Sequence, residues 1–225
     1  MQQLTLDMGL APSPSFSNFL AGSNEASLAH LQLWAGSPTR SPVPTYLWGE
    51  SGSGKSHLLQ AAAQVMAAGG AQIGRLSTQS VACDLQYQAH WAAVVMDDVH
   101  AYDLAQQHAA FTWFIEAQTQ GRWVLAAGAL PVVDLALRDD LRTRLGWGHV
   151  FALQALSDTE RRAVLRQQAD ARGIFLKDEV MDFVLSRFSR DLGSLTQLLD
   201  HLDHYALRQQ RPITIPLVKL MLEQL

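Results

Sequence analysis

The chain has 225 residues, of which 48% are hydrophobic and 17% are charged, as in a folded globular protein of one or two domains. Its net charge of −4 argues against a chain-wide nucleic-acid surface, although it does not exclude a local basic patch. The single cysteine, Cys83, cannot form an internal disulfide and has no neighbouring cation, so we expect a structural cysteine and a cytoplasmic protein. We expect no signal peptide and no membrane-spanning segment, because no basic start precedes an apolar run of sufficient length.

Residues 1–15 are predicted to form a tail, because Pro12 and Pro14 disfavour regular structure. Apolar side chains alternate along it: Leu4, Leu6, Met8 and Leu10. This alternation fits an extended peptide that docks in a groove, or an edge strand packed on its own domain. The pattern alone does not choose between the two.

A helix is predicted from about Glu25 to Trp34, with Ser23 or Asn24 as its cap. The apolar segment Phe16–Leu20 before it could wall an adenine pocket or simply pack in the core. Residues 36–44 contain three prolines among serines and are predicted to be a loop.

The strongest motif matches G-x-x-x-x-G-K-[ST], the phosphate-binding loop of nucleotide-binding proteins. A short apolar strand, Thr45–Trp48, precedes it and a helix, His57–Ala68, follows it, which is the context that the motif requires. Backbone N–H groups and the helix start would hold phosphate, Lys55 would reach the β- and γ-phosphates, and Ser56 would ligate Mg²⁺. The residues expected to bind the nucleotide are Gly49, Glu50, Ser51, Gly52, Ser53, Gly54, Lys55, Ser56 and His57.

A second strand is predicted over Ala71–Leu76, and residues 77–90 are ambiguous, with part of them helical. The apolar run Trp91–Val99 then reads as a buried parallel strand that ends in Asp97 and Asp98. Asp97 is expected to hold Mg²⁺, and Asp98 to polarise the attacking water. The alternative is a strand that merely ends in a solvated pair of aspartates.

Two more strands are predicted, over Arg122–Ala127 and Val150–Leu153, with a helix at His108–Thr119 and a helix-like stretch at Val132–Leu137. The side chains that should face inward from the helix are Phe111, Phe114 and Ile115.

The strand–helix alternation stops near Leu156. A capping box at Ser157–Glu160 predicts a helix to about Arg172, ended by Gly173. Further helices are predicted over Lys177–Arg187, Asp191–Arg208 and Leu217–Leu225. We therefore predict a tail at 1–15, an α/β nucleotide-binding domain at 16–155 and an all-helical domain at 156–225.

These features resemble the AAA+ core of the DnaA family of bacterial replication initiators. The resemblance is carried by the phosphate loop and by Val94–Val99, Leu141–Gly148 with its Arg-Leu-Gly-Trp-Gly run, and Arg190-Asp191-Leu192. It implies a P-loop AAA+ fold, in which a parallel sheet flanked by helices is followed by a small helical lid.

The resemblance also implies two roles for arginines. Arg144 matches the arginine finger, which would act in trans on a partner's nucleotide, and Arg190 matches the lid arginine that senses the nucleotide phosphates. On the residues alone, Arg144 could instead be a surface arginine that pairs with Asp139 or Asp140.

The chain departs from the family after the strand Trp123–Leu125, where a polar residue usually lies near the γ-phosphate. Here the run Ala126–Leu130 contains no polar side chain. We therefore expect ADP or ATP to bind with Mg²⁺, and intrinsic ATP hydrolysis to be weak or absent.

We expect this protein, unlike a full initiator, to have no helix-turn-helix domain after the helical part and no long N-terminal domain. Its start is similar to the peptide that docks on the sliding clamp, the beta subunit of DNA polymerase III, through Gln3, Leu4, Leu6 and Met8. We expect a regulator, dimeric or otherwise homo-oligomeric, that is tethered to the clamp and contacts DNA through it. It would stimulate ATP hydrolysis by the DnaA initiator and so inhibit re-initiation.

Two other classes stay open. A DNA-remodelling or helicase-loading ATPase would bind DNA directly, against which the net charge argues. A small-molecule kinase would need catalytic arginines in its lid, for which Arg161, Arg162 and Arg166 are candidates, although a solvated helix face explains them as well. His201 and His204, one turn apart, could ligate zinc or simply lie on a solvated face.

Overall fold

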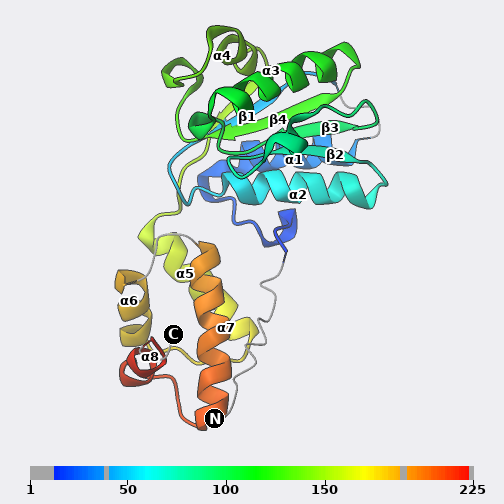
Figure 1. The fold of residues 1–225 in the computed structure, drawn as a ribbon. Helices are drawn as coiled ribbons and strands as arrows, with labels where there is room; N and C mark the ends of the chain where they lie inside the picture. Colours follow the sequence, from blue (N-terminus) through cyan, green and yellow to red (C-terminus); the bar gives the residue numbers. More distant parts are fainter. Residues whose placement is uncertain (1–12, 38–40, 188–191, 223–225) are drawn as a thin grey trace. The chain divides into compact units, whose positions relative to one another are not determined.

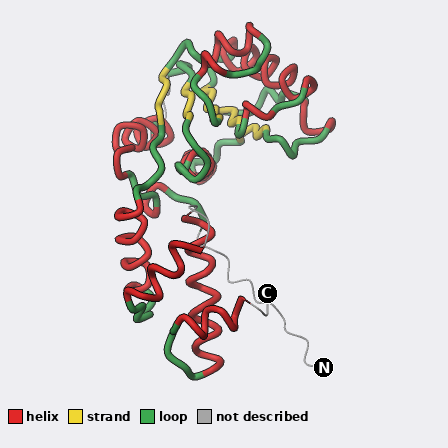
Figure 2. The backbone as a smooth tube through the Cα atoms, turned by 90° about the vertical axis from the view of Figure 1, so that its left-hand side faces the viewer, coloured by secondary structure: helices red, strands yellow, loops and turns green. Residues whose placement is uncertain are grey.

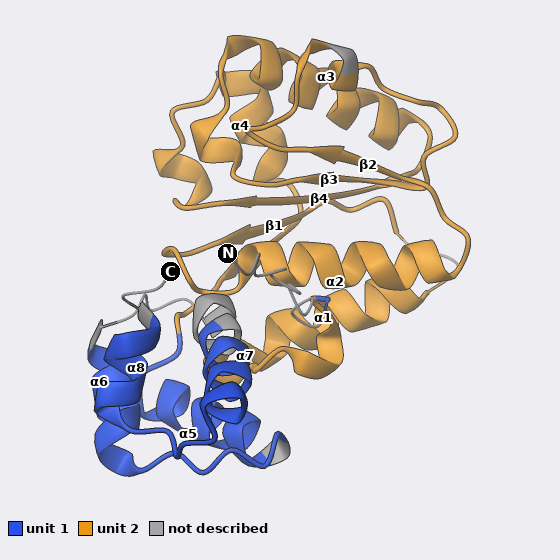
Figure 3. Cartoon of the chain, turned by 60° about the horizontal axis from the view of Figure 1, so that its bottom comes forward, with its two compact units in different colours: residues 1–13, 156–225 blue, residues 14–155 orange. Residues whose placement is uncertain are grey.

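The computed structural model describes residues 13–37, 41–187 and 192–222. The chain divides into one compact unit over residues 14–155 and a second that contains residues 156–225 (Figure 3). The strands lie in the first unit, whereas the second is built from helices (Figure 2). In the described part, no helix is both long and apolar enough to cross a membrane.

The first unit is organised around a parallel sheet whose five described strands are ordered β2-β3-β4-β1-β5. The strands are β1 (Thr45–Trp48), β2 (Ile73–Leu76), β3 (Ala93–Met96), β4 (Trp123–Gly128) and β5 (His149–Ala152). In register, Trp48 of β1 pairs with Gly128 of β4, and Met96 of β3 pairs with Ala126. The segments that follow β1, β3 and β4 therefore leave the sheet at one edge, with β4 in the middle.

Helices cover both faces of the sheet (Figure 1): α1 (Glu25–Gly36) and α2 (Lys55–Ala68) lie on one face, and α3 (Leu104–Thr119) and α4 (Asp139–Leu145) on the other. Successive strand residues point to opposite faces, so β4 contributes to both layers. Val124 and Ala126 pack in the α3 layer with Trp113. Trp123 and Leu125 pack in the layer of α1 and α2. Burial on both faces explains why the strands read as uninterrupted apolar runs.

The second unit contains α5 (Asp158–Ala171), α6 (Asp178–Arg187), α7 (Leu192–Gln209) and α8 (Ile215–Leu222). The predicted capping box is present at the start of α5: Ser157 Oγ accepts from the Glu160 amide at 3.2 Å, and Glu160 Oε2 accepts from the Ser157 amide at 2.8 Å. The core of this unit includes Leu165, Met181, Val184, Leu199, Leu202 and Val218.

Three helices begin earlier than predicted. Helix α2 begins at Lys55 rather than His57, directly after Gly54. Helix α3 begins at Leu104 rather than His108, since Asp103 and Gln106 form a reciprocal capping box. Its buried side includes Trp113 and Phe114, whereas Phe111 and Ile115 are only half-buried. Helix α8 begins at Ile215 rather than Leu217, because a proline in the first helical turn loses no hydrogen bond that the helix needs.

Two further expectations are corrected, and the ambiguous segment 77–90 is resolved. The stretch Val132–Leu137 is only a 3₁₀ turn over Val132–Asp134, after which the chain is extended and buries Leu135 and Leu137. Between residues 77 and 90 the regular structure is one 3₁₀ turn, Ala82–Leu85. Asn24 stands at the cap position of α1, but its side chain makes no capping bond. It exchanges two hydrogen bonds with the backbone of Gln154, at 2.8 and 2.9 Å.

Candidate functional site

The loop between β1 and α2 is curled tightly by glycines. Gly54 has a φ of +91°, and a Cβ atom there would lie 2.5 Å from Cε2 of Phe19. A Cβ atom on Gly49 would lie 2.2 Å from the carbonyl oxygen of Leu153. Side chains are therefore excluded at both positions, and the loop presents bare backbone, as close approach to a phosphate requires.

Lys55 is folded into this loop. Its side chain is buried, and Nζ donates to the carbonyl oxygens of Gly49 and Glu50, both at 2.8 Å. Burial lowers the pKa of Lys55, and the charges of Asp98 and Asp97 oppose that shift. A buried ammonium that rests on carbonyl oxygens is chemically suited to a phosphate, which would be a stronger, charged acceptor.

The start of α2 adds a second set of donors. The first hydrogen bond within the helix runs from the Leu58 amide to the Gly54 carbonyl at 3.0 Å, so the amides before Leu58 have no acceptor inside the helix. Gly54 has no side chain with which to cap them. Bound phosphate would supply the missing acceptors and would sit at the positive end of the helix dipole.

Asp97 lies beside the loop, close enough for the Ser56 side chain to influence the pKa of its carboxylate. Burial raises the pKa of Asp97, while the Ser56 side chain opposes the rise. A serine hydroxyl and a carboxylate side by side are ligand types that Mg²⁺ uses at phosphate sites. The residues present therefore fit a nucleotide phosphate with its metal ion.

The two aspartates after β3 are not equivalent. Asp98 has a φ of +53°, its amide donates to Asp97 Oδ1 at 3.0 Å, and its side chain is 49% exposed. Exposure of Asp98 agrees with the solvated alternative for that residue, whereas Asp97 is turned toward the loop. Only Asp97 thus has the surroundings of a buried ligand.

The segment before α1 lies against the phosphate loop. Phe19 meets Gly54, and its ring centre lies 5.5 Å from that of His57. Nε2 of His57 lies 2.9 Å from the carbonyl oxygen of Ser15 and donates to it. The His57 ring thus holds this segment in place. Of His57, only the backbone amide, in the first turn of α2, is therefore a candidate for binding phosphate.

Arg144 on α4 lies between aromatic rings. Its guanidinium carbon is 4.9 Å from the ring centre of Trp147 and 5.5 Å from that of Phe111. The carboxylates that the sequence offered it pair elsewhere, Asp140 with Arg138 at 2.7 Å and Asp139 with Arg142 at 2.6 Å. Among the described residues, no ion pair involves Arg144.

Five predicted site residues cannot be placed. Arg190 and the clamp-peptide residues lie outside the described part of the chain: Gln3, Leu4, Leu6 and Met8. Two contacts that matter here were missed by the sequence analysis, namely Phe111 against Arg144 and His100 against the end of β4. Both join separate elements, and no local pattern signals them.

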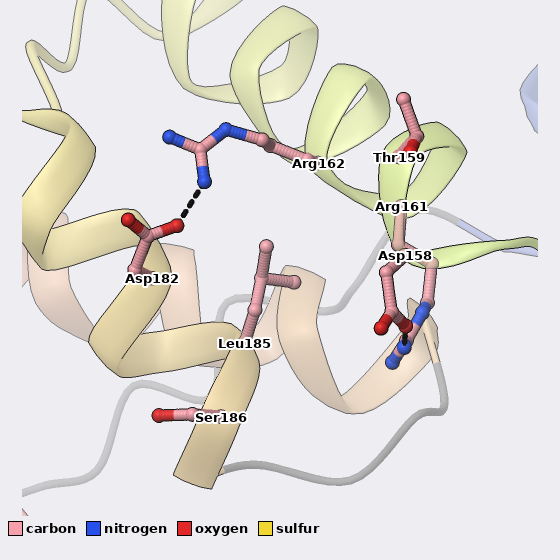
Figure 4. Close-up of a pocket in the computed structure, with 7 residues that line it drawn as sticks. All are labelled: Asp158, Thr159, Arg161, Arg162, Asp182, Leu185 and Ser186. Carbon is pink, nitrogen blue, oxygen red and sulfur yellow. Dashed lines mark hydrogen bonds and ion pairs between the residues drawn. The ribbon is translucent and has the colours of Figure 1, made fainter.

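The helical unit carries a pocket of about 350 Å³ (Figure 4). Arg162 pairs with Asp182, and Arg161 lies beside Asp158. Arg162 and Arg166 both also pair with Asp178. Arg161 is buried rather than solvated. Because these arginines are paired within their own unit, they do not favour a kinase lid. Among the described residues, no three or more histidine, cysteine, aspartate or glutamate side chains gather as metal ligands, so His201 and His204 gain no support as a zinc site.

The parallel sheet, the phosphate loop, the acidic strand end and the helical unit define a P-loop AAA+ protein. The family model for the lid domain of Hda matches residues 158–222, and the model for the bacterial DnaA ATPase domain matches residues 10–79. The chain is thus an Hda-like, DnaA-related member of the AAA+ proteins.

Solved structures agree on the fold. Domain III of the replication initiation protein DnaA from Thermotoga maritima superposes with a TM-score of 0.77 at 20% identity, over 95% of this chain and 97% of that one. AMPPCP-bound DnaA from Aquifex aeolicus has a TM-score of 0.67 at 18% identity, over 90% and 71%. The RuvB Holliday junction branch migration motor of Thermotoga maritima has a TM-score of 0.62 at 16% identity, over 90% and 69%.

Proposed function

We propose that this protein is a DnaA-related regulator of replication that stimulates ATP hydrolysis by the DnaA initiator in trans. The observation that carries the proposal is the state of Arg144, which contacts two aromatic rings and pairs with no carboxylate among the described residues. The match to the Hda lid domain supports the same conclusion.

The nucleotide bound by this protein would have a structural role rather than serve as a substrate for hydrolysis. The loop amides, Lys55 and the start of α2 would bind the phosphates of ADP or ATP, and Ser56 with Asp97 would hold Mg²⁺. A bound nucleotide would supply the negative charge that these donors lack. Without a polar side chain in Ala126–Leu130, hydrolysis at this site would be weak or absent.

Arg144 would act on ATP held by the initiator. Its guanidinium would stabilise the charge that develops on the phosphate oxygens in the transition state. An arginine supplied in trans typically accelerates hydrolysis by ~10³–10⁵, which corresponds to about 4–7 kcal/mol of the barrier. The initiator would be left with ADP and inactive.

The clamp peptide would bring the protein to newly replicated DNA. We propose that Gln3 hydrogen-bonds in a polar notch of the sliding clamp while Leu4, Leu6 and Met8 fill an apolar one. This part rests on the sequence alone, and DNA would be contacted through the clamp.

The test measures ATP hydrolysis by DnaA in the presence of the clamp loaded on DNA. Arg144→Ala should remove most of the stimulation, and Arg142→Ala is the matched control because Arg142 lies on the same helix and is already paired with Asp139. Equal stimulation by the wild-type and Arg144→Ala proteins would refute the proposal. Equal losses in both variants would point to damage to α4 rather than to a finger.

A further inference from the structure

The sheet edge that carries the proposed nucleotide site lacks a polar side chain at the end of one strand, β4. The end of β4 lies between the phosphate loop, which follows β1, and the aspartates, which follow β3. Ligands of parallel α/β sheets bind at this edge. Yet β4 itself offers only Ala126–Leu130 there, without a polar side chain.

A polar side chain reaches the end of β4 from the segment that follows the neighbouring strand, β3. The left-handed conformation of Asp98 turns the chain into a 3₁₀ turn, Val99–Ala101, whose first residue is fully buried. This turn brings His100 across to β4, where the amide of Ala129 donates to His100 Nδ1 at 3.2 Å. An imidazole is thereby tied to the backbone just beyond the end of β4.

This hydrogen bond determines the tautomer of the ring. Nδ1 accepts from an amide, so the proton of the neutral imidazole is on Nε2. The His100 side chain is 30% exposed, and Nδ1 lies 4.0 Å from Asp98 Oδ1. His100 therefore presents one N–H donor, on Nε2, near Asp98 at the sheet edge that carries the proposed site.

We propose that His100 senses the terminal phosphate of a bound nucleoside triphosphate through Nε2–H, in place of a polar side chain on β4. The inference rests on the proposed nucleotide binding and names the residue that would distinguish the triphosphate from the diphosphate. In this role His100 is a specificity-determining residue, and the Ala129 amide is what orients it.

The test uses the full chain and two probes, ADP and AMPPCP, each with Mg²⁺. His100→Asn is the informative variant, because the asparagine Oδ1 can still accept from the Ala129 amide while the Nε2 donor is gone. We expect its affinity for AMPPCP to fall about tenfold, as for loss of a hydrogen bond to a charged group, with little change for ADP. Lys55→Ala is the reference variant and should lose both nucleotides.

A second readout needs no affinity measurement. In long-range ¹H–¹⁵N spectra, the His100 ring should show the Nε2–H tautomer in the free protein, and the Nε2 resonance should shift with AMPPCP but not with ADP. Equal effects of His100→Asn on both probes, or none on either, would overturn this inference alone. If wild-type protein bound neither probe, the proposed nucleotide binding would fail and the inference with it.

Discussion

The guanidinium carbon of Arg144 lies 4.9 Å from the centre of the Trp147 ring. Phe111 of α3 contributes a second ring at 5.5 Å, and the same ring also carries Arg138 at 4.7 Å. An aromatic face attracts a cation without cancelling its charge, unlike a carboxylate. The arrangement therefore orients Arg144 and leaves its positive charge available to a partner.

Removal of the Trp147 ring should weaken the finger without abolishing it. A cation–π contact at an exposed site is worth about 0.5–1 kcal/mol, so Trp147→Ala should reduce stimulated DnaA hydrolysis by about 2- to 5-fold through poorer positioning of Arg144. Trp147→Phe should retain most of the stimulation because it keeps a ring. Val133→Ala is the control, since Val133 is also exposed and apolar (79%). A Trp147→Ala protein as active as the control would show that the ring does not position Arg144.

Asp97→Asn should stabilise the nucleotide-free protein and impair its Mg²⁺-dependent nucleotide binding. Burial raises the pKa of Asp97, so the folded state disfavours the carboxylate charge, and this cost is present wherever the carboxylate is ionised. The nucleotide-free variant should therefore unfold at a higher temperature than wild type at pH 7, an advantage that disappears at a pH below the ordinary pKa of aspartate. The same variant should lose the Mg²⁺ dependence of nucleotide affinity. Asp98→Asn, at a more exposed position, should change stability less; a less stable Asp97→Asn protein would contradict this account.

His30 should make the first unit sensitive to mild acid. Burial, together with the charge of His149, lowers the pKa of His30 from 6.5 to about 4. A lowered pKa means that the folded state favours the neutral ring, so the stability is present above pH 6.5 and is lost as the pH falls toward 4. His30→Gln does not titrate, and its amide can keep the contact with Thr45 Oγ1 that Nε2 makes at 3.0 Å.

The measurement for His30 is the free energy of unfolding at pH 7 and pH 5. Wild type should lose more stability over this interval than His30→Gln. Glu160 and Asp178 do not confuse the comparison, because hydrogen bonds from Ser157 and Arg162, respectively, lower their pKa values and move their titration to more acidic pH. Parallel pH profiles for the two proteins would exclude His30 as the source.

The clamp peptide can be tested separately from the finger. Replacing both Gln3 and Leu4 by alanine should abolish binding to the isolated sliding clamp in a pull-down, because the proposed polar and apolar contacts are both removed. Thr5→Ala is the matched control, since position 5 is the variable one in Gln-Leu-x-Leu. Binding by the double variant would place the clamp contact elsewhere in the chain.

The features that could be predicted from the sequence are those encoded within short stretches. The phosphate loop lies between the predicted strand and helix, and the Ser157–Glu160 capping box starts α5 as predicted. Each depends on residues a few positions apart, so local spacing and periodicity suffice. The alternation of strands and helices predicts a parallel α/β domain followed by a helical one, and the AAA+ fold was the expectation that came from the resemblance to the DnaA family.

The tertiary structure decided how the charged and polar side chains are used. It alone shows that Asp139 and Asp140 pair with other arginines and leave Arg144 to the rings of Phe111 and Trp147. It also separates the roles of Asp97 and Asp98, which are adjacent and identical in type, and it delivers His100 to the end of β4. These outcomes depend on one left-handed residue and on contacts between elements far apart in the chain. A local pattern carries no record of such contacts, because they exist only once the layers have packed.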